Sequence, residues 1–147
     1  MKKNNFVPRG IRNNNPLNIE RNPKTAWVGM NNLQTDRRFV QFVSIEYGIR
    51  AAFIILRNYW YKHRLRTLRK MINRWCPPSE KGNLTSQYVN YVAMKADILP
   101  DEELEAPDKG REIWKTIVNK MILVECGRWI DYGVIGRAWD LAYGKGK

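Results

Sequence analysis

The chain has 147 residues, with 26 Lys and Arg against 14 Asp and Glu and a formal net charge of +12. This length fits one domain with its own hydrophobic core. The charge implies an anionic partner such as nucleic acid, acidic lipid or the polymers of a bacterial envelope. The six tryptophans and seven tyrosines suit a core, and they also suit the walls of a groove that binds sugars or nucleobases.

Several functional classes are disfavoured by what the sequence lacks. The first residues lead into no apolar segment, so we expect no signal peptide, and no apolar run reaches membrane-spanning length. Cys76 and Cys126 form no disulfide framework, and a single histidine, His63, argues against a zinc site. We therefore expect reduced thiols, no metal and no cofactor. Residues 1–8 form a basic N-terminal arm, 9–143 a single domain and 144–147 a tail.

The first motif of the domain, residues 9–19, reads Arg-Gly-Ile-Arg-Asn-Asn-Asn-Pro-Leu-Asn-Ile. Asn side chains bond nearby backbone groups and tolerate the left-handed conformation, so this segment predicts a structured loop. Clustered amides beside apolar residues suit a wall that hydrogen-bonds a polar ligand; the alternative is a plain turn. The candidates are Asn14, Asn15 and Asn18. Short apolar runs at 27–29 and 38–43 then predict a small antiparallel hairpin.

Apolar residues at helical spacing predict five helices after this segment. Ser44, Thr67, Thr85 and Asp131 are the expected caps of four of them. The predicted helices end near residues 61, 75, 96, 126 and 142. Between Glu46 and Glu80 the chain has many Arg and Lys residues and no acidic one. Such a run is either a solvated surface or a contact for an anion.

The helix at 113–126 carries the candidate general acid. Glu125 lies three residues after Ile122 and four after Met121, so it continues an apolar face in the last turn before Gly127. Burial and the partial negative charge of a helix C-terminus both oppose ionisation of a carboxyl group. A carboxyl that keeps its proton near neutral pH suits general acid catalysis. The alternative is a structural ion pair with Arg128 or Arg137.

Further motifs follow residues 9–19 in a fixed order. They are Trp27-Val28-Gly29, Phe39-Val40-Gln41-Phe42, Glu46-Tyr47-Gly48-Ile49-Arg50-Ala51, Asn73-Arg74-Trp75-Cys76-Pro77-Pro78-Ser79-Glu80, Thr85 and Tyr88. This order resembles lysozyme-like proteins from tailed-phage virions and prophages, over residues 9 to about 92. The family tends to end with Glu-Asn-Gly on a helix; here Glu125 and Gly127 match and Cys126 departs.

A more distant similarity links the chain to bacterial cell-wall glucosaminidases. Their catalytic helix stands in front of an Asn-Asn loop and a hairpin, whereas here the helix with Glu125 stands at the back. The order is therefore that of a circular permutation. Together the resemblances imply a mainly α (α+β), lysozyme-like fold, with about five helices, a small β-hairpin lobe and a groove between them.

The implied activity is cleavage of peptidoglycan glycan strands by a muramidase or lytic transglycosylase, with Glu125 as general acid. Glu80 is the first candidate for a second carboxylate, ahead of Asp36 and Glu46, although a single-carboxylate mechanism needs none. The expected substrate-binding residues are Asn14, Asn15, Asn18, Trp27, Trp75 and Tyr88. For the three aromatic residues, packing in the core is the alternative.

The resemblance also implies a setting. The expected location is a phage virion, or the host cytoplasm with delivery to the cell wall. The expected partners are glycan strands, the anionic cell-wall surface and other virion proteins. One alternative is a catalytically inactive virion protein that keeps the fold for glycan binding or assembly. A nucleic-acid-binding domain is the other, but no known motif supports it.

Overall fold

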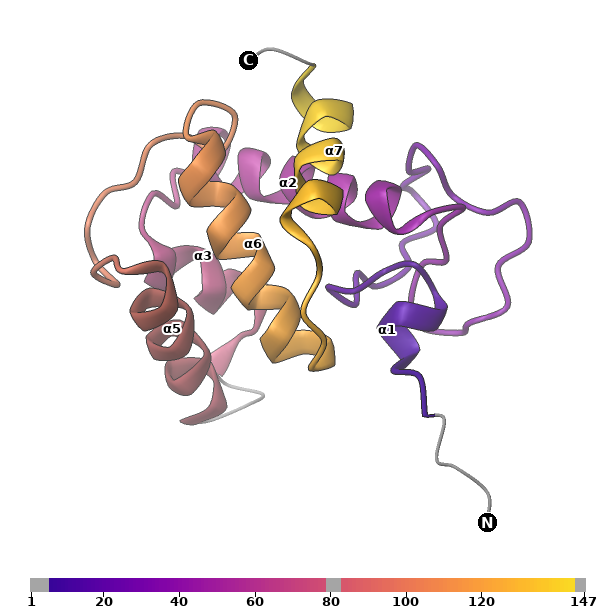
Figure 1. Ribbon diagram of the computed structural model, residues 1–147, viewed down its shortest axis with the longest axis horizontal. Coiled ribbons are helices and arrows are strands. Elements are labelled where there is room, and N and C mark those ends of the chain that lie inside the picture. Colours follow the sequence, from indigo (N-terminus) through magenta and orange to yellow (C-terminus); the bar gives the residue numbers. More distant parts are fainter. Residues whose placement is uncertain (1–5, 79–82, 145–147) are drawn as a thin grey trace.

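Helices dominate the computed structural model, which describes residues 6–78 and 83–144 (Figure 1). The described residues form six helices: α1 (Arg9–Arg12), α2 (Ile45–Tyr61), α3 (Leu68–Trp75), α5 (Asn83–Ala96), α6 (Arg111–Cys126) and α7 (Tyr132–Tyr143). The mainly α class is confirmed, and the five longer helices lie where apolar spacing predicts them. The short α1 is an addition, because residues 9–12 were expected to be loop.

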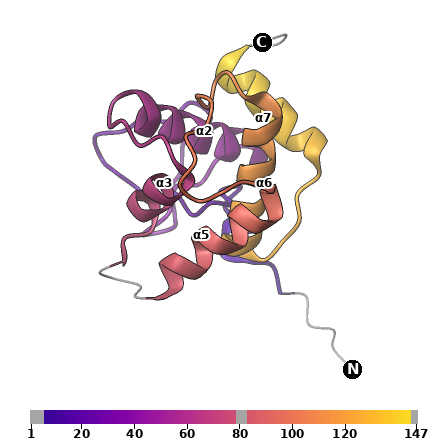
Figure 2. The ribbon, with the colours of Figure 1, turned by 90° about the vertical axis from the view of Figure 1, so that its left-hand side faces the viewer.

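Helix α6 lies in the middle of the molecule. In Figure 1, α3 and α5 lie to its left and residues 13–43 to its right, and Figure 2 brings α3 and α5 to the front. Its apolar face is buried, with Trp114, Ile117 and Ile122 fully inaccessible to solvent. Helices α2 and α7 pack together beside it, where the rings of Phe53 and Trp139 meet edge to face at 5.6 Å. Burial of such side chains is the main stabilising term of the fold.

The helix ends follow the predicted chemistry with two exceptions. Thr67 accepts a hydrogen bond from the backbone of Lys70, and Asp131 accepts one from Gly133, as N-caps do. The side chain of Ser44 makes no such bond. The prediction that Thr85 is a cap is wrong, because α5 begins two residues earlier, at Asn83. The buried Thr85 hydroxyl instead donates to the carbonyl of Cys76 at 2.8 Å.

The segment 13–43 contains two isolated antiparallel bridges, Glu20 with Phe39 and Met30 with Phe42, where a hairpin was expected. Side chains occupy many of the backbone groups that a regular ladder would pair. Asn15 alone accepts from the N–H of Ile19 and donates to the carbonyls of Ile19 and Val40. The described part of this segment is therefore an irregular lobe held by amides.

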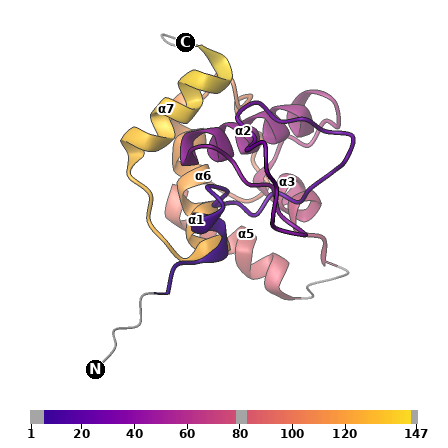
Figure 3. The same ribbon diagram turned by 90° about the vertical axis from the view of Figure 1, so that its right-hand side faces the viewer.

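The Asn-rich loop has the backbone that its composition predicts. Asn14 and Asn18 adopt left-handed φ values of 53° and 54°. The loop lies against α2 (Figure 3), and the closest approach is at Gly48, where a Cβ atom would collide with the carbonyl of Asn14. Gly48 is thus required by the close packing of the loop on the helix.

The ends of the domain are tied down. Arg128 donates to the carbonyl of Phe6 at 2.9 Å, and Arg12 donates to that of Val7. Residues 1–5 of the predicted arm and 145–147 of the predicted tail lie outside the described residues. Among the helices described, none combines the length and the apolar character needed to cross a membrane.

Gly48→Ala should destabilise the protein, although alanine normally stabilises a helix interior relative to glycine. The added methyl group forces the Asn14 carbonyl to move, and such overpacking costs about 1–3 kcal/mol. Gly136→Ala in α7 is the matched control, because its Cβ would approach only the flexible ends of Arg111 and Lys115. Urea unfolding of the two variants measures the difference. Equal free energies of unfolding would contradict the proposed loop-to-helix fit.

Candidate functional site

Glu125 lies in the last turn of α6, half-buried, and its carboxyl group accepts three hydrogen bonds. The Nδ2 of Asn18 donates to Oε1 at 3.2 Å. The indole Nε1 of Trp75 and the hydroxyl of Tyr88 both donate to Oε2, at 3.2 Å and 3.1 Å. The N-terminal lobe, α3 and α5 therefore each contribute one donor. The structure brings together four of the residues that sequence analysis selected.

Asn18 joins the N-terminal lobe to the end of α6. Besides the carboxyl of Glu125, its Nδ2 donates to the backbone carbonyl of the same residue at 3.3 Å. That carbonyl belongs to the last turn of the helix, where no intrahelical donor is available. The contact bridges 107 positions of the sequence. The left-handed backbone of Asn18 presents its amide to the helix end.

Tyr88 is buried, with 5% of its surface exposed. Burial raises the pKa of its hydroxyl well above the usual value, and the adjacent Glu125 raises it further through its negative charge and its hydrogen bond. Tyr88 therefore stays protonated near neutral pH and donates to the carboxyl. Trp75 ends α3 and meets the ring of Tyr59 edge to face at 6.4 Å, which holds its indole N–H toward Glu125.

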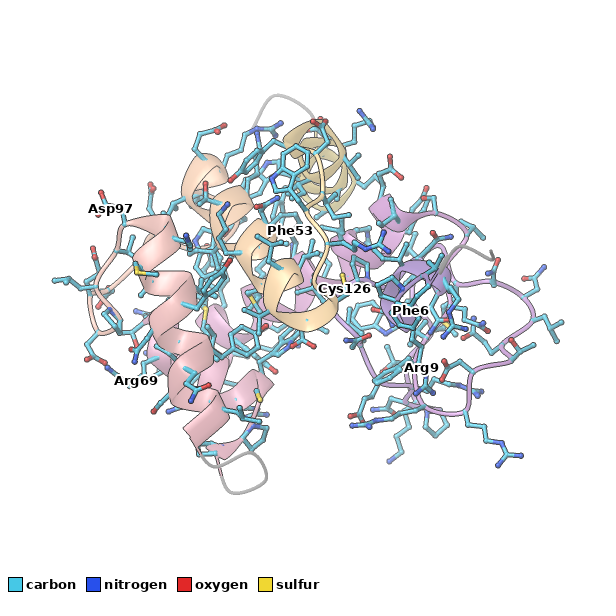
Figure 4. All side chains as sticks on the ribbon, turned by 60° about the horizontal axis from the view of Figure 1, so that its bottom comes forward. Phe6, Arg9, Phe53, Arg69, Asp97 and Cys126 are labelled. Carbon is cyan, nitrogen blue, oxygen red and sulfur yellow. The ribbon has the colours of Figure 1, made fainter. Side chains whose placement is uncertain are left out.

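Three adjoining cavities form a groove across this cluster. The largest, of 610 Å³, lies between α5 and α6 and includes Tyr88 and Glu125. A second, of 270 Å³, shares Cys76 and Glu125 with the first and includes Asn18 and Trp75. A third, of 320 Å³, shares Asn18, Glu20 and Trp75 with the second. In Figure 4 the neighbouring Cys126, at the end of α6, lies between α5 on the left and the N-terminal residues Phe6 and Arg9 on the right.

The other predicted binding residues separate into two groups. Trp27 is partly exposed and lines the 320 Å³ cavity. Asn15 is fully buried, and its amide is engaged by backbone groups of the lobe. Asn14 donates to the carbonyl of Phe42. The amides of Asn14 and Asn15 thus hold the lobe together, and only Asn18 of the three reaches the groove.

Neither of the two described candidates for a second carboxylate, Asp36 and Glu46, lines a cavity with Glu125. Glu80 lies outside the described residues. Asp36 accepts two hydrogen bonds from Arg9, and the Arg9 guanidinium holds the pKa of that carboxyl far below its usual range. Glu46 pairs with Arg137 at 3.2 Å, beside a different cavity. Both carboxylates have structural partners.

Glu20 was missed by the sequence analysis. It lines the same 270 Å³ cavity as Glu125 and pairs with Arg38 at 2.9 Å, and both side chains are mostly exposed. Only the folding of the lobe places it there. Gln87 and Tyr91 were also missed, although they follow Leu84 at helical spacing and all three face the 610 Å³ cavity. The helical spacing of these three residues could therefore have identified them as one face from the sequence.

Both cysteines lie beside the carboxyl and are free thiols. Cys76 lines two of the cavities, and burial raises the pKa of the Cys126 thiol. Within the described residues, no three His, Cys, Asp or Glu side chains are grouped so that they could hold a metal ion.

The chain is 37% identical to Protein P5 of Pseudoalteromonas phage PM2 over 125 residues, which is 84% of this chain and 74% of that protein. It belongs to the family of that phage protein. No protein-family model matches the chain.

Glu125→Gln should be at least as stable as the parent near pH 7. Glutamine keeps one acceptor oxygen for Trp75 and Tyr88, and its NH₂ group can meet Asn18 after rotation of that amide. Glu125→Ala should melt several degrees lower, because leaving buried donors without an acceptor costs about 1–3 kcal/mol. Thermal melts of the three proteins provide the measurement. A Gln variant that melts well below the parent would indicate that Glu125 is a structural anchor.

Tyr88→Phe should weaken the alkaline sensitivity of the fold. Because the pKa of Tyr88 in the folded state is raised above the usual value of 10.0 for tyrosine, its contribution to the free energy of unfolding is intact below that pH. This stabilisation is lost as the pH rises toward the pKa of Tyr88 in the folded state, because unfolding then releases the proton of the Tyr88 hydroxyl. The variant lacks this proton, so its free energy of unfolding should fall less steeply above pH ~10. Urea titrations across that range test this, and parallel curves would contradict it.

Proposed function

We propose that this protein cleaves the glycan strands of peptidoglycan, as a muramidase or lytic transglycosylase, with Glu125 as the general acid. The observation that carries the proposal is the position of this one carboxyl group. It lies where two cavities of a groove adjoin, and it accepts hydrogen bonds from Asn18, Trp75 and Tyr88. Donors from three separate segments hold it in a fixed orientation, which a general acid requires.

A lysozyme-like fold is part of the proposal. The groove lies between a helical body and the irregular lobe of residues 13–43, and its carboxyl comes from the C-terminus of a buried helix. The Asn18–Glu125 contact supports the circular permutation, because it brings the N-terminal motif beside a helix near the end of the chain. The two bridges of the lobe occupy the position of the proposed hairpin.

In the proposed reaction, Glu125 transfers its proton to the glycosidic oxygen while the bond from that oxygen to the anomeric carbon breaks. The bonding electron pair goes to the oxygen, which leaves as a hydroxyl group. The acetamido or hydroxyl group of the sugar itself then attacks the anomeric carbon. In hydrolysis, water attacks the anomeric carbon of the cyclic oxazolinium ion that the acetamido group forms, the ring C–O bond breaks, and a proton of the water returns to the Glu125 carboxylate. Attack by the sugar hydroxyl instead gives an anhydro product, and the proton of that hydroxyl returns to the carboxylate.

The groove offers suitable contacts for sugar rings on both sides of Glu125. Trp27 and Trp75 border the lobe side, and Tyr88 and Tyr91 border the side between α5 and α6. Aromatic faces bind the apolar faces of sugar rings, and their N–H and O–H groups bond to sugar hydroxyls. Asn18 has its amide at the carboxyl, where the reacting sugar would lie.

We propose a single-carboxylate mechanism. Glu20 is the other described carboxylate that lines the 270 Å³ cavity, but it is paired with Arg38 and 61% of its side chain is exposed. An exposed, paired carboxylate is a weak nucleophile or base, because water and the guanidinium stabilise its charge. Because a group of the substrate itself attacks the anomeric carbon, this mechanism needs no second carboxylate.

Membership in a phage protein family supports a role in a phage particle that meets the cell wall of a host. The net charge of +12 would hold the protein on an anionic envelope, with a strength that falls as salt rises. Other virion proteins are the proposed assembly partners, and cytoplasmic synthesis followed by delivery to the wall is the proposed route.

The purified protein should clear suspensions of peptidoglycan, and Glu125→Gln should lower the rate at least ~100-fold because it removes the transferable proton. Glu20→Gln is the matched control in the same cavity and should keep the rate within about tenfold. Turbidity measures clearing, and mass spectrometry of the fragments separates hydrolysed from anhydro ends.

Undiminished clearing by Glu125→Gln would place the acid elsewhere. Loss of activity in Glu20→Gln equal to that in Glu125→Gln would replace the single-carboxylate mechanism by a two-carboxylate one. A protein that binds glycan strands without cleaving them would be the inactive virion component. Tight DNA binding without cleavage would identify a nucleic-acid-binding domain.

A further inference from the structure

A fourth cavity, of 400 Å³, continues the groove at the far side of the lobe. It shares Asn22 and Thr25 with the 320 Å³ cavity, so it lies on the same path that starts at Glu125. Arg21 and Arg37 both line it. The path therefore begins at a carboxyl group and ends between two guanidinium groups.

The carboxylates closest in sequence to these arginines are already engaged. Asp36 is held by Arg9, Asn13 and two backbone N–H groups. Glu20 is paired with Arg38. Residues 20–38 carry four basic side chains against these two acidic ones. The arginines of the cavity thus have no acidic partner within the lobe.

The two guanidinium groups are largely available for a ligand. Arg21 makes one hydrogen bond, from Nη1 to the backbone carbonyl of Asp36 at 3.0 Å, which leaves the other guanidinium donors. Arg37 is exposed and makes no hydrogen bond or ion pair with the part of the chain that the structure describes. A planar guanidinium matches a carboxylate, which it binds through two parallel hydrogen bonds.

We propose that the cavity of Arg21 and Arg37 binds a carboxylate substituent of the glycan strand whose glycosidic bond lies at Glu125. This inference rests on the proposed function. Peptidoglycan has two sources of such a group, the free carboxylates of the peptide stems and the lactyl carboxylate of sugars without a stem, because attachment of a stem converts the lactyl group into an amide. Both present the same chemistry to the arginines.

The residues at the opposite end of the groove favour binding of the strand in one of its two possible directions. There the 610 Å³ cavity is bordered by Leu84, Tyr91 and Val124, and none of the described residues that line it is basic. An acidic substituent gains no ion pair from those residues, whereas it gains one at the lobe end. The two ends thus distinguish the two directions in which a substituted strand can lie across Glu125.

The test uses the Glu125→Gln protein, in which binding is separated from cleavage, and adds Arg37→Glu. Lys109→Glu is the control, since it makes the same change in charge on an exposed residue. It precedes α6, whose 16 residues place it about 24 Å from the Glu125 end. Tryptophan fluorescence reports binding, because Trp27 and Trp75 line the groove. The probes are soluble glycan strands with native peptides, and the same strands after amidation of their carboxyl groups.

Arg37→Glu should raise the dissociation constant for native strands about two- to fivefold, as expected from the loss of one exposed ion pair. The same variant should leave the constant for amidated strands unchanged, and Lys109→Glu should leave both unchanged. Strands stripped of their peptides carry only lactyl carboxylates, which the stripping frees from their amide bonds. Weakening on these strands shows that the cavity accepts a lactyl carboxylate, and its absence assigns the peptide stem.

Equal effects of Arg37→Glu and Lys109→Glu, or equal effects on native and amidated strands, would overturn the inference. The proposed function has a separate readout, which is cleavage of the same strands by the protein with Glu125 intact. If the protein with Glu125 intact cleaves the strands but Arg37→Glu does not change their dissociation constants, only the proposed carboxylate site is rejected. Absence of both cleavage and binding would reject the proposed function together with the inference.

Discussion

The geometry of the groove depends on one contact between distant parts of the chain, in which the amide of Asn18 binds the last turn of α6. One nitrogen donates to both the carboxyl and the backbone carbonyl of Glu125. The helix end thereby gains a donor for a carbonyl that has no intrahelical partner. The lobe in turn gains a fixed position against the helical body.

The lobe achieves its rigidity with side-chain amides in place of a β-ladder. Asn15 pairs three backbone groups, and Gln41 accepts from the N–H of Thr35 and donates to its hydroxyl. Buried polar groups of the backbone must be paired, and amides that carry both donor and acceptor can do this where strands are too short. The result leaves Asn18 and Trp27 at the surface of the groove. An irregular lobe can thus still position individual side chains.

Two features of the surroundings of Glu125 act on its carboxyl group, which are shielding from water and hydrogen-bond donors. Tyr88 and the apolar face of α6 withdraw the carboxyl from water, while three donors bind its oxygens. The raised pKa of Tyr88 shows the same coupling from the other side, because that hydroxyl keeps its proton beside a carboxylate. Such a site holds a single acid in a fixed orientation. The basic residues of the lobe place positive charge farther along the groove.

The sequence by itself determined the helices, the inward direction of Glu125 and the left-handed Asn positions, because apolar spacing and Asn chemistry act locally. It also selected Asn18, Trp75 and Tyr88, which the fold then placed on one carboxyl. The local sequence pattern cannot tell which of Asn15 and Asn18 faces the groove, because both are asparagines in the same loop. Only the tertiary structure buried the amide of Asn15 and brought Glu20 into the groove. Those outcomes depend on which backbone groups lie opposite each side chain, and contacts across the chain decide that.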